Sequence, residues 1–195
     1  MGSNMKKLLF LCTINRHRSV IAEFLFREIL AKSKRKFVKE IEISSAGIVT
    51  QQQKAELRQK GIGLPKPLFG YRPMPCVILY MQKMVGIDVS EHSSRGITTK
   101  MMKAADLIVG MGERHKEAVL QMYPTASGRI VTLAELSRPF EFPDIAPAEP
   151  PGLMPPAKFC MLQCDHWTVT ETAVIDIRER LLEAKTKILS RLGVR

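Results

Sequence analysis

The chain has 195 residues, with 30 Lys and Arg residues against 19 Asp and Glu residues, so its formal net charge is +11. Its hydrophobic share of 45% is typical of one packed domain and excludes a chain that is disordered throughout. No apolar run approaches the roughly 20 residues of a spanning helix, and the run after Lys6 and Lys7 is too short for a signal peptide. We therefore expect a cytoplasmic protein without membrane contact.

The charge and the cysteines narrow the function classes further. A basic surplus indicates an anionic partner, such as nucleic acid, an acidic surface or a phosphorylated substrate. The chain has four cysteines, too few for a disulfide scaffold at this length. Residues 1–4 precede a second methionine and resemble a remnant of an expression vector, so the expected domain covers residues 5–195.

The first predicted elements are a strand and a helix joined by a short polar loop. Lys6–Cys12 ends in an unbroken apolar run, which is typical of a strand buried on both faces. Apolar residues recur at helical spacing over Ser19–Leu30, and Ile41–Ile43 predicts a second strand that ends in Ser44-Ser-Ala-Gly47. This order is that of a βαβ unit.

The rest of the chain alternates between helices and strands. Residues 50–75 carry several prolines, which indicates an insertion with one short helix at Gln52–Gln59. We then expect helices at Cys76–Val85, Thr98–Lys103, Glu113–Met122 and Thr172–Leu192, strands at Asp106–Val109 and Arg129–Leu133, and irregular structure at Pro139–Pro156. The alternation predicts an α/β fold, with a parallel sheet covered by helices on both faces.

The loop after the first strand carries the residues that indicate a chemical function. It reads Cys12-Thr-Ile-Asn-Arg-His-Arg18-Ser19, a C-x5-R-S pattern between a buried strand and a helix. Such a loop turns backbone N–H groups inward at the helix N-terminus and forms a cradle for an anion. The helix end and Arg18 favour a thiolate at Cys12, Arg18 can bind two phosphate oxygens, and Ser19 can hydrogen-bond the sulfur. These groups suit displacement at phosphorus through a cysteinyl-phosphate.

The same residues carry a resemblance to a known family. The segment LLFLCTINRHRSVIAEFLFRE is similar to the N-terminal motif of low-molecular-weight protein tyrosine phosphatases, which include arginine-phosphate phosphatases and are related to thioredoxin-coupled arsenate reductases. The resemblance continues through Ser44–Gly47, Gly86–Arg95, Ala105–Val109 and the final helix, outside insertions near 48–69 and 146–166. It implies a single α/β domain with a four-stranded parallel sheet flanked by helices.

The resemblance also implies roles for individual residues. Cys12 would be the nucleophile, Arg18 the clamp on the phosphoryl group, and Ser19 the partner of the thiolate. The substrate-binding residues of the loop would be Thr13, Ile14, Asn15, Arg16, His17 and Ser19. Asn15, Ser45 and His92 would brace the loop from behind. We expect no metal or cofactor; the partners would be a phosphorylated protein or a small phosphate monoester, with inorganic phosphate or sulfate bound in the loop.

The reaction also needs a carboxyl group that protonates the leaving oxygen and then activates water. In the family this group is an aspartate, normally followed by proline, on a loop after the fourth strand. Asp144 lies at about the expected distance and is our candidate, although Ile145 stands in place of the proline. A second alignment would place Glu171 or Asp165 at the site.

Several positions depart from the family pattern. Ile14 replaces the usual glycine, so the loop either keeps this β-branched residue in an allowed region or is strained. Gly112 replaces an aspartate that braces the loop, and the aromatic pair that shapes the rim for an aryl phosphate is absent after Asp144. Arg16 and His17 are either solvated polar residues or a source of positive charge that favours a doubly charged phosphate.

Two further patterns point to other functions. Cys160 and Cys164 could form a redox relay, as an arsenate reductase requires, or a metal pair, or be core residues. Lys32–Lys39 resembles a nucleic-acid patch, but no nucleic-acid-binding motif accompanies it, so we expect no nucleic-acid binding. The sequence therefore predicts a protein tyrosine phosphatase that acts through phosphocysteine. The alternatives are an arsenate reductase and a catalytically weak phosphate-binding or phosphoprotein-binding domain; phosphoarginine also stays open as a substrate.

Overall fold

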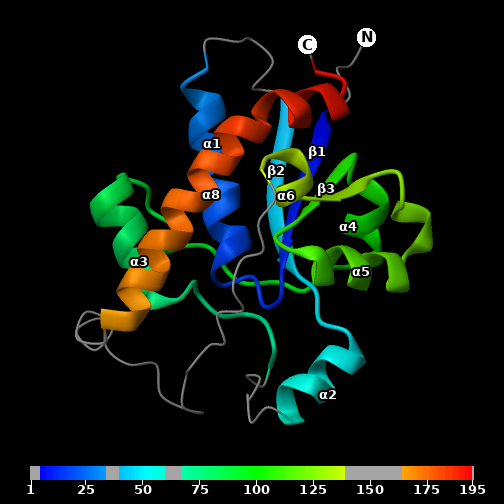
Figure 1. Ribbon diagram of the computed structural model, residues 1–195, viewed down its shortest axis with the longest axis horizontal. Helices are drawn as coiled ribbons and strands as arrows, with labels where there is room; N and C mark the ends of the chain where they lie inside the picture. Colours follow the sequence, from blue (N-terminus) through cyan, green and yellow to red (C-terminus); the bar gives the residue numbers. More distant parts are fainter. Residues whose placement is uncertain (1–4, 34–39, 60–66, 139–163, 195) are drawn as a thin grey trace.

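A four-stranded parallel sheet forms the centre of the molecule, in the strand order β2-β1-β3-β4 (Figure 1). The computed structural model describes residues 5–33, 40–59, 67–138 and 164–194. The strands are β1 (Lys6–Cys12), β2 (Ile41–Gly47), β3 (Leu107–Gly110) and β4 (Ile130–Thr132). This arrangement confirms the predicted fold class. β2 runs on to Gly47 rather than ending at Ile43, because its pairing with β1 continues as far as Cys12.

Helices cover both faces of this sheet. The long helices α1 (Arg18–Ala31) and α8 (Cys164–Arg191) lie on one face, and α4 (Thr99–Ala104) and α5 (Glu113–Met122) lie on the other (Figure 1). Side chains along β1 alternate between the two faces. Leu8 and Phe10 belong to the core beneath α1 and α8, whereas Leu9 and Leu11 belong to the core beneath α4 and α5. The apolar run of β1 is therefore buried on both faces, as predicted.

The segment between β2 and β3 contains three predicted helices, the last of which is α4. α2 (Gln51–Gln59) confirms the short helix in the insertion and lies beyond the carboxyl ends of the strands (Figure 1). α3 (Pro75–Tyr80) continues as a π-helical segment, Met81–Val85. This segment ends at Gly86, whose left-handed backbone (φ 79) is the usual helix C-cap.

The end of the chain differs from the prediction at two points. After α5 come a 3₁₀ turn, Pro124–Ala126, and the short helix α6 (Leu133–Leu136), too short for a helical period to show in the sequence. Thr132 ends β4 and caps α6, which is why the strand stops before Leu133. α8 begins before Thr172, because Trp167 extends its apolar face and its ring packs on Tyr80 with centroids 5.1 Å apart.

Some predicted features lie outside the described residues. They are the segment 1–4, residues 34–39 of the basic cluster, the irregular segment after 138, Asp144, Cys160 and most of the second insertion. The backbone of Cys164 belongs to α8, but its side chain is outside the described set. None of the helices in the described ranges is long and apolar enough to cross a membrane.

The strand order places a topological switch point at the carboxyl end of β1. β1 lies between β2 and β3, so the connections to its two neighbours run over opposite faces of the sheet. In open parallel sheets, ligands bind outside the carboxyl ends of the strands at such a switch point. The C-x5-R-S loop lies at this position.

Candidate active site

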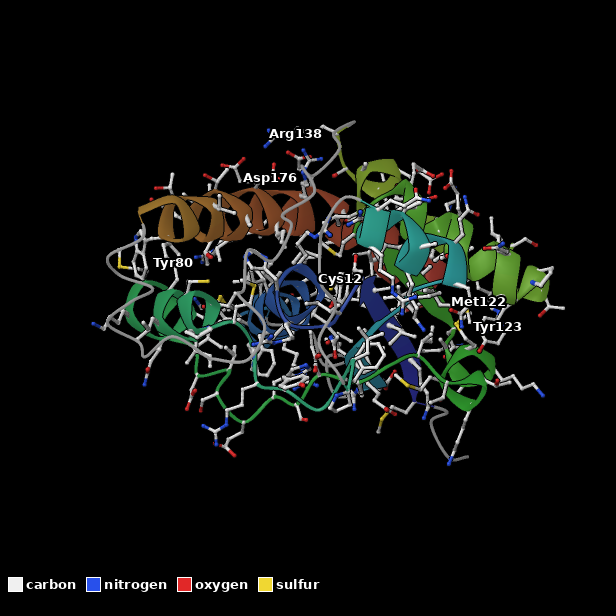
Figure 2. All side chains as sticks on the ribbon, turned by 90° about the horizontal axis from the view of Figure 1, so that it is seen from below. Cys12, Tyr80, Met122, Tyr123, Arg138 and Asp176 are labelled. Carbon is white, nitrogen blue, oxygen red and sulfur yellow. The ribbon has the colours of Figure 1, made fainter. Side chains whose placement is uncertain are left out.

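The loop Thr13–His17 joins β1 directly to α1. Cys12, labelled in Figure 2, ends the strand, and Arg18 begins the helix. Cys12 is 3% exposed and Arg18 is 6% exposed, so both are enclosed. Cys12 Sγ lies 3.0 Å from Ser19 Oγ. The hydrogen bond that the sequence predicted between Ser19 and the sulfur is therefore present.

Asn15 fixes the loop from behind. Its Nδ2 donates to Ser19 Oγ (3.0 Å) and to Ser45 Oγ (2.8 Å). Its Oδ1 accepts from His92 Nε2 and from the backbone N–H of Arg95, each at 3.1 Å. The brace expected from Asn15, Ser45 and His92 is thus confirmed. Because Ser19 Oγ accepts from Asn15, its own proton is available to the sulfur of Cys12.

The backbone strain that Ile14 could have caused is absent. The left-handed conformation falls one residue later, on Asn15 (φ 56), which tolerates it better than a β-branched residue does. Ile14 is 9% exposed and keeps an ordinary negative φ. The first of the two alternatives for Ile14 therefore holds.

A buried carboxylate completes the brace. Glu23, 3% exposed, accepts a hydrogen bond from Ser45 Oγ and forms an ion pair with Arg27 at 2.6 Å. Burial lowers the pKa of His92, and this outweighs the opposing effect of Glu23, 3.9 Å from its Nδ1. A neutral His92 donates through Nε2 to Asn15, so its role is to position the loop.

The first turn of α5 holds the other side of the loop. Thr13 Oγ1 accepts a hydrogen bond from Arg114 Nη2 (3.2 Å) and lies 3.2 Å from His115 Nε2. His115 is fully buried, and its pKa lies well below the ordinary value because of burial, followed by the charges of Arg18 and Arg114. Neither residue was predicted from the sequence, in which the one available signal is Gly112, just before them, in place of a bracing aspartate.

The outer half of the loop is buried, so the first of the two alternatives for Arg16 and His17, solvated polar residues, does not hold. Arg16 is 2% exposed and His17 is 7% exposed. Arg16 Nε donates to the carbonyl of Arg72 (2.9 Å), and its guanidinium lies 5.3 Å from the centre of the Tyr71 ring. His17 Nε2 lies 3.3 Å from Thr170 Oγ1 on α8. Two distant segments cover these residues, which local sequence patterns do not reveal.

Two aromatic side chains, Phe69 and Tyr71, lie near the loop. They come from the segment before α3 and not from the segment after Asp144, where the aromatic pair of the family pattern is absent. A Cβ atom on Gly47 would lie 2.5 Å from the Phe69 ring and 2.7 Å from the Thr13 carbonyl, and one on Gly96 would lie 2.5 Å from the same ring. Glycine is therefore required where Phe69 packs against the backbone. Together with Tyr71, this ring forms an aromatic side to the loop.

Comparison with known proteins agrees with this geometry. The family model of the low molecular weight phosphotyrosine protein phosphatases matches residues 7–76, which include the whole loop. A probable low molecular weight protein-tyrosine-phosphatase, EpsP from Ralstonia solanacearum, is 28% identical over 134 residues, or 69% of this chain and 74% of the relative. Over this part, the chain is similar to the low molecular weight protein-tyrosine-phosphatases. The resemblance predicted from the sequence is confirmed.

Solved structures share the fold of this chain. Vibrio vulnificus Wzb, in complex with benzylphosphonate, has a TM-score of 0.65 at 21% identity and covers 93% of this chain and 99% of its own. The YwlE arginine phosphatase from Geobacillus stearothermophilus has a TM-score of 0.63 at 18% identity and covers 97% of both chains. These structures confirm the single α/β domain.

The three candidates for the general acid are only partly described by the structure. Asp144 lies outside the described residues, as does the side chain of Asp165. Glu171 accepts a hydrogen bond from Tyr80 Oη at 3.3 Å, on α3 rather than on the loop (Figure 2 labels Tyr80). Burial and the charge of Glu171 raise the pKa of Tyr80, so the phenol stays protonated and donates. Glu171 is thus engaged by α3, and Asp144 stays our candidate.

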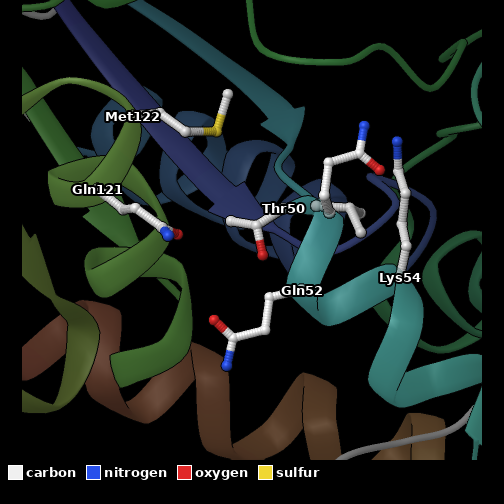
Figure 3. A pocket seen from close by; sticks show the side chains of 7 residues that line it. Thr50, Gln52, Lys54, Gln121 and Met122 are labelled. Carbon is white, nitrogen blue, oxygen red and sulfur yellow. The ribbon is translucent and has the colours of Figure 1, made fainter.

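A groove of about 420 Å³ lies between the start of α2 and the end of α5 (Figure 3). Its lining residues are Val49, Thr50, Gln51, Gln52, Lys54, Gln121 and Met122. None of them belongs to the Cys12–Arg18 loop. The groove is therefore a feature separate from the candidate active site.

Proposed function

We propose that this chain hydrolyses phosphate monoesters through a phosphocysteine intermediate, with phosphotyrosine in proteins as the preferred substrate. The observation that carries this proposal is the Cys12 sulfur, enclosed in the loop at the N-terminus of α1, 3.0 Å from Ser19 Oγ and close in sequence to Arg18. A helix N-terminus and a guanidinium together favour both a thiolate and a phosphoryl dianion.

In the first step the Cys12 thiolate attacks phosphorus, an S–P bond forms, and the P–O bond of the ester breaks. Arg18 and the backbone N–H groups of the loop stabilise the equatorial oxygens in the transition state. The carboxyl group of Asp144 protonates the departing oxygen. The products of this step are a phosphocysteine at residue 12 and a neutral alcohol.

In the second step a water molecule attacks the phosphocysteine, and the Asp144 carboxylate accepts its proton. The S–P bond breaks, and inorganic phosphate and the Cys12 thiolate are formed. The Ser19 hydroxyl stabilises the departing thiolate, since its own oxygen already accepts from Asn15. A thiolate nucleophile needs reducing surroundings, so we place this enzyme in the cytoplasm.

Two observations support an aryl substrate. Phe69 and Tyr71 supply aromatic surface beside the loop, and the named relative is a probable protein-tyrosine-phosphatase. Phosphoarginine is the competing substrate, and hydrolysis of a phosphotyrosine peptide and a phosphoarginine peptide of matched sequence separates the two. A higher kcat/KM for phosphotyrosine supports the proposal.

The decisive experiment measures hydrolysis of p-nitrophenyl phosphate by wild type, Cys12→Ser and Cys76→Ala. Cys76 is the other described cysteine and is 1% exposed, so it controls for loss of a buried thiol. We expect Cys12→Ser to lose about 10³-fold or more in kcat, and Cys76→Ala to keep most of the activity. A wild-type chain that binds phosphate but shows no turnover would establish a binding domain instead.

A further inference from the structure

Thr13, the residue directly after the nucleophile, is held by two neighbouring residues of α5. Its hydroxyl accepts a hydrogen bond from Arg114 Nη2 and lies at hydrogen-bond distance from His115 Nε2, each at 3.2 Å. The Thr13 carbonyl lies close against Gly47, the last residue of β2. Both the side chain and the backbone of Thr13 are thus in contact with elements outside the loop.

The chemistry of these groups leaves the hydroxyl of Thr13 little freedom. A hydroxyl has one proton and two lone pairs, and a guanidinium can only donate, so Arg114 occupies one lone pair. His115 is fully buried and neutral, so its Nε2 either accepts the Thr13 proton or occupies the second lone pair. In either tautomer, two partners fix the orientation of the hydroxyl.

The place of Arg114 suggests a functional rather than a stabilising role. A cation in the first turn of a helix opposes the helix dipole and costs stability there. The backbone of Arg114 is nevertheless held in place, because Gln53 of α2 donates to its carbonyl (3.3 Å). The guanidinium consequently adds positive charge beside the Cys12–Arg18 loop.

We propose that Arg114 and His115 are positioning residues for the phosphate loop. Through Thr13 they hold the backbone that follows Cys12, so that its N–H groups face the phosphoryl oxygens. They take over the bracing that a carboxylate at position 112 would otherwise provide, and they do so without adding negative charge beside the anion. This inference rests on the proposed function, because it concerns the loop that receives the phosphoryl group.

A double-mutant cycle tests whether Arg114 acts through Thr13. The variants are Thr13→Val, Arg114→Gln and the double variant, compared by kcat/KM for p-nitrophenyl phosphate. We expect each single variant to lose about fivefold, the equivalent of one hydrogen bond, and the double variant to lose no more than Thr13→Val alone. Multiplying losses would show that Arg114 acts independently of Thr13 and would overturn the proposal.

A charge control and a conservative variant exclude a general effect. Lys103→Gln removes one exposed charge from α4, just before the amino end of β3, and should leave kcat/KM unchanged. His115→Gln keeps a hydrogen-bonding group, whereas His115→Leu removes it. If Thr13 is positioned by His115, Gln restores most of the activity that Leu loses, with melting temperatures used to confirm that both variants are folded.

Titration with inorganic phosphate separates this inference from the proposed function. We expect Arg114→Gln and Thr13→Val to weaken phosphate binding severalfold, with the same coupling as in kcat/KM. A wild type without hydrolysis would refute the proposed function, while coupled losses in phosphate affinity would still support the positioning role. The positioning role would be overturned if folded Arg114→Gln and His115→Leu kept both their phosphate affinity and their kcat/KM within twofold of wild type.

Discussion

Asn15→Ala should weaken both the fold and the reaction, because Asn15 carries the hydrogen bonds behind the loop and its left-handed backbone. The side chain is 0% exposed and bonds Ser19, Ser45, His92 and the Arg95 N–H. Alanine removes these four hydrogen bonds, of which those to Ser19 and Ser45 are buried, at a total cost of about 2–4 kcal/mol. Alanine at φ 56 adds about 1–2 kcal/mol.

Asn15→Gly separates the two contributions. Glycine loses the same hydrogen bonds but adopts the left-handed backbone without strain. Relative to alanine, glycine avoids the backbone strain of about 1–2 kcal/mol. Its greater conformational freedom in the unfolded chain offsets about 0.5–1 kcal/mol of this gain in stability. The glycine variant should therefore be about 0.5–1 kcal/mol more stable than the alanine variant, and both should be far less stable than wild type.

Urea unfolding measures both differences. The single tryptophan, Trp167, packs on Tyr80 and provides a fluorescence signal. If the free energies of unfolding of both variants lay within about 0.5 kcal/mol of the wild-type value, the bracing role of Asn15 would be refuted, because typical surface substitutions have effects of that size. An alanine variant at least as stable as the glycine variant would refute the argument from backbone strain at Asn15.

Three further outcomes follow from the site. Ser19→Ala should slow departure of the thiolate, so that phosphocysteine accumulates and p-nitrophenol is released in a burst, whereas a steady rate without a burst would contradict this role. Asp144→Asn should lower kcat for phenyl phosphate by about 10²-fold or more, and Glu171→Gln should not; the reverse result would move the acid role to Glu171. Burial lowers the pKa of His115 in the folded chain, so below a pH of about 6.5 the unfolded chain binds a proton that the folded chain does not. The free energy of unfolding therefore decreases as the pH falls through this range. His115→Gln should reduce this loss in urea unfolding between pH 7 and 5, and an unchanged slope would contradict the burial argument.

The framework of the site could be predicted because its signals are local. Three signals lie within about 25 residues: the apolar run of Lys6–Cys12, the helical spacing after Ser19, and the six-residue step from Cys12 to Arg18. The strand and the helix that they predict follow from the periodicity of the apolar residues alone. Ser19 beside the sulfur follows from the same geometry, since the first turn of α1 returns toward the end of β1.

The surroundings of the loop could not be predicted in the same way. Arg16 and His17 look like solvated residues in the sequence, because nothing local shows that residues 71–74 and α8 fold over them. Arg114 follows the loop by almost one hundred positions and contacts it only because β3 pairs beside β1. These contacts depend on tertiary packing, and a single sequence carries no periodic signal for them.

The four bracing contacts together explain how the loop tolerates departures from the family pattern. Thr13 binds α5, Asn15 binds β2 and residues 92–95, Arg16 binds the segment after α2, and His17 binds α8. These side chains are directed to neighbouring elements. Under the proposed function, the anion in the loop is therefore bound by the backbone N–H groups, Cys12 and Arg18. A side chain between Cys12 and Arg18 then affects the site chiefly through the contact that it makes with a neighbouring element. Ile14 is compatible with the site because Asn15, and not Ile14, takes the left-handed backbone conformation.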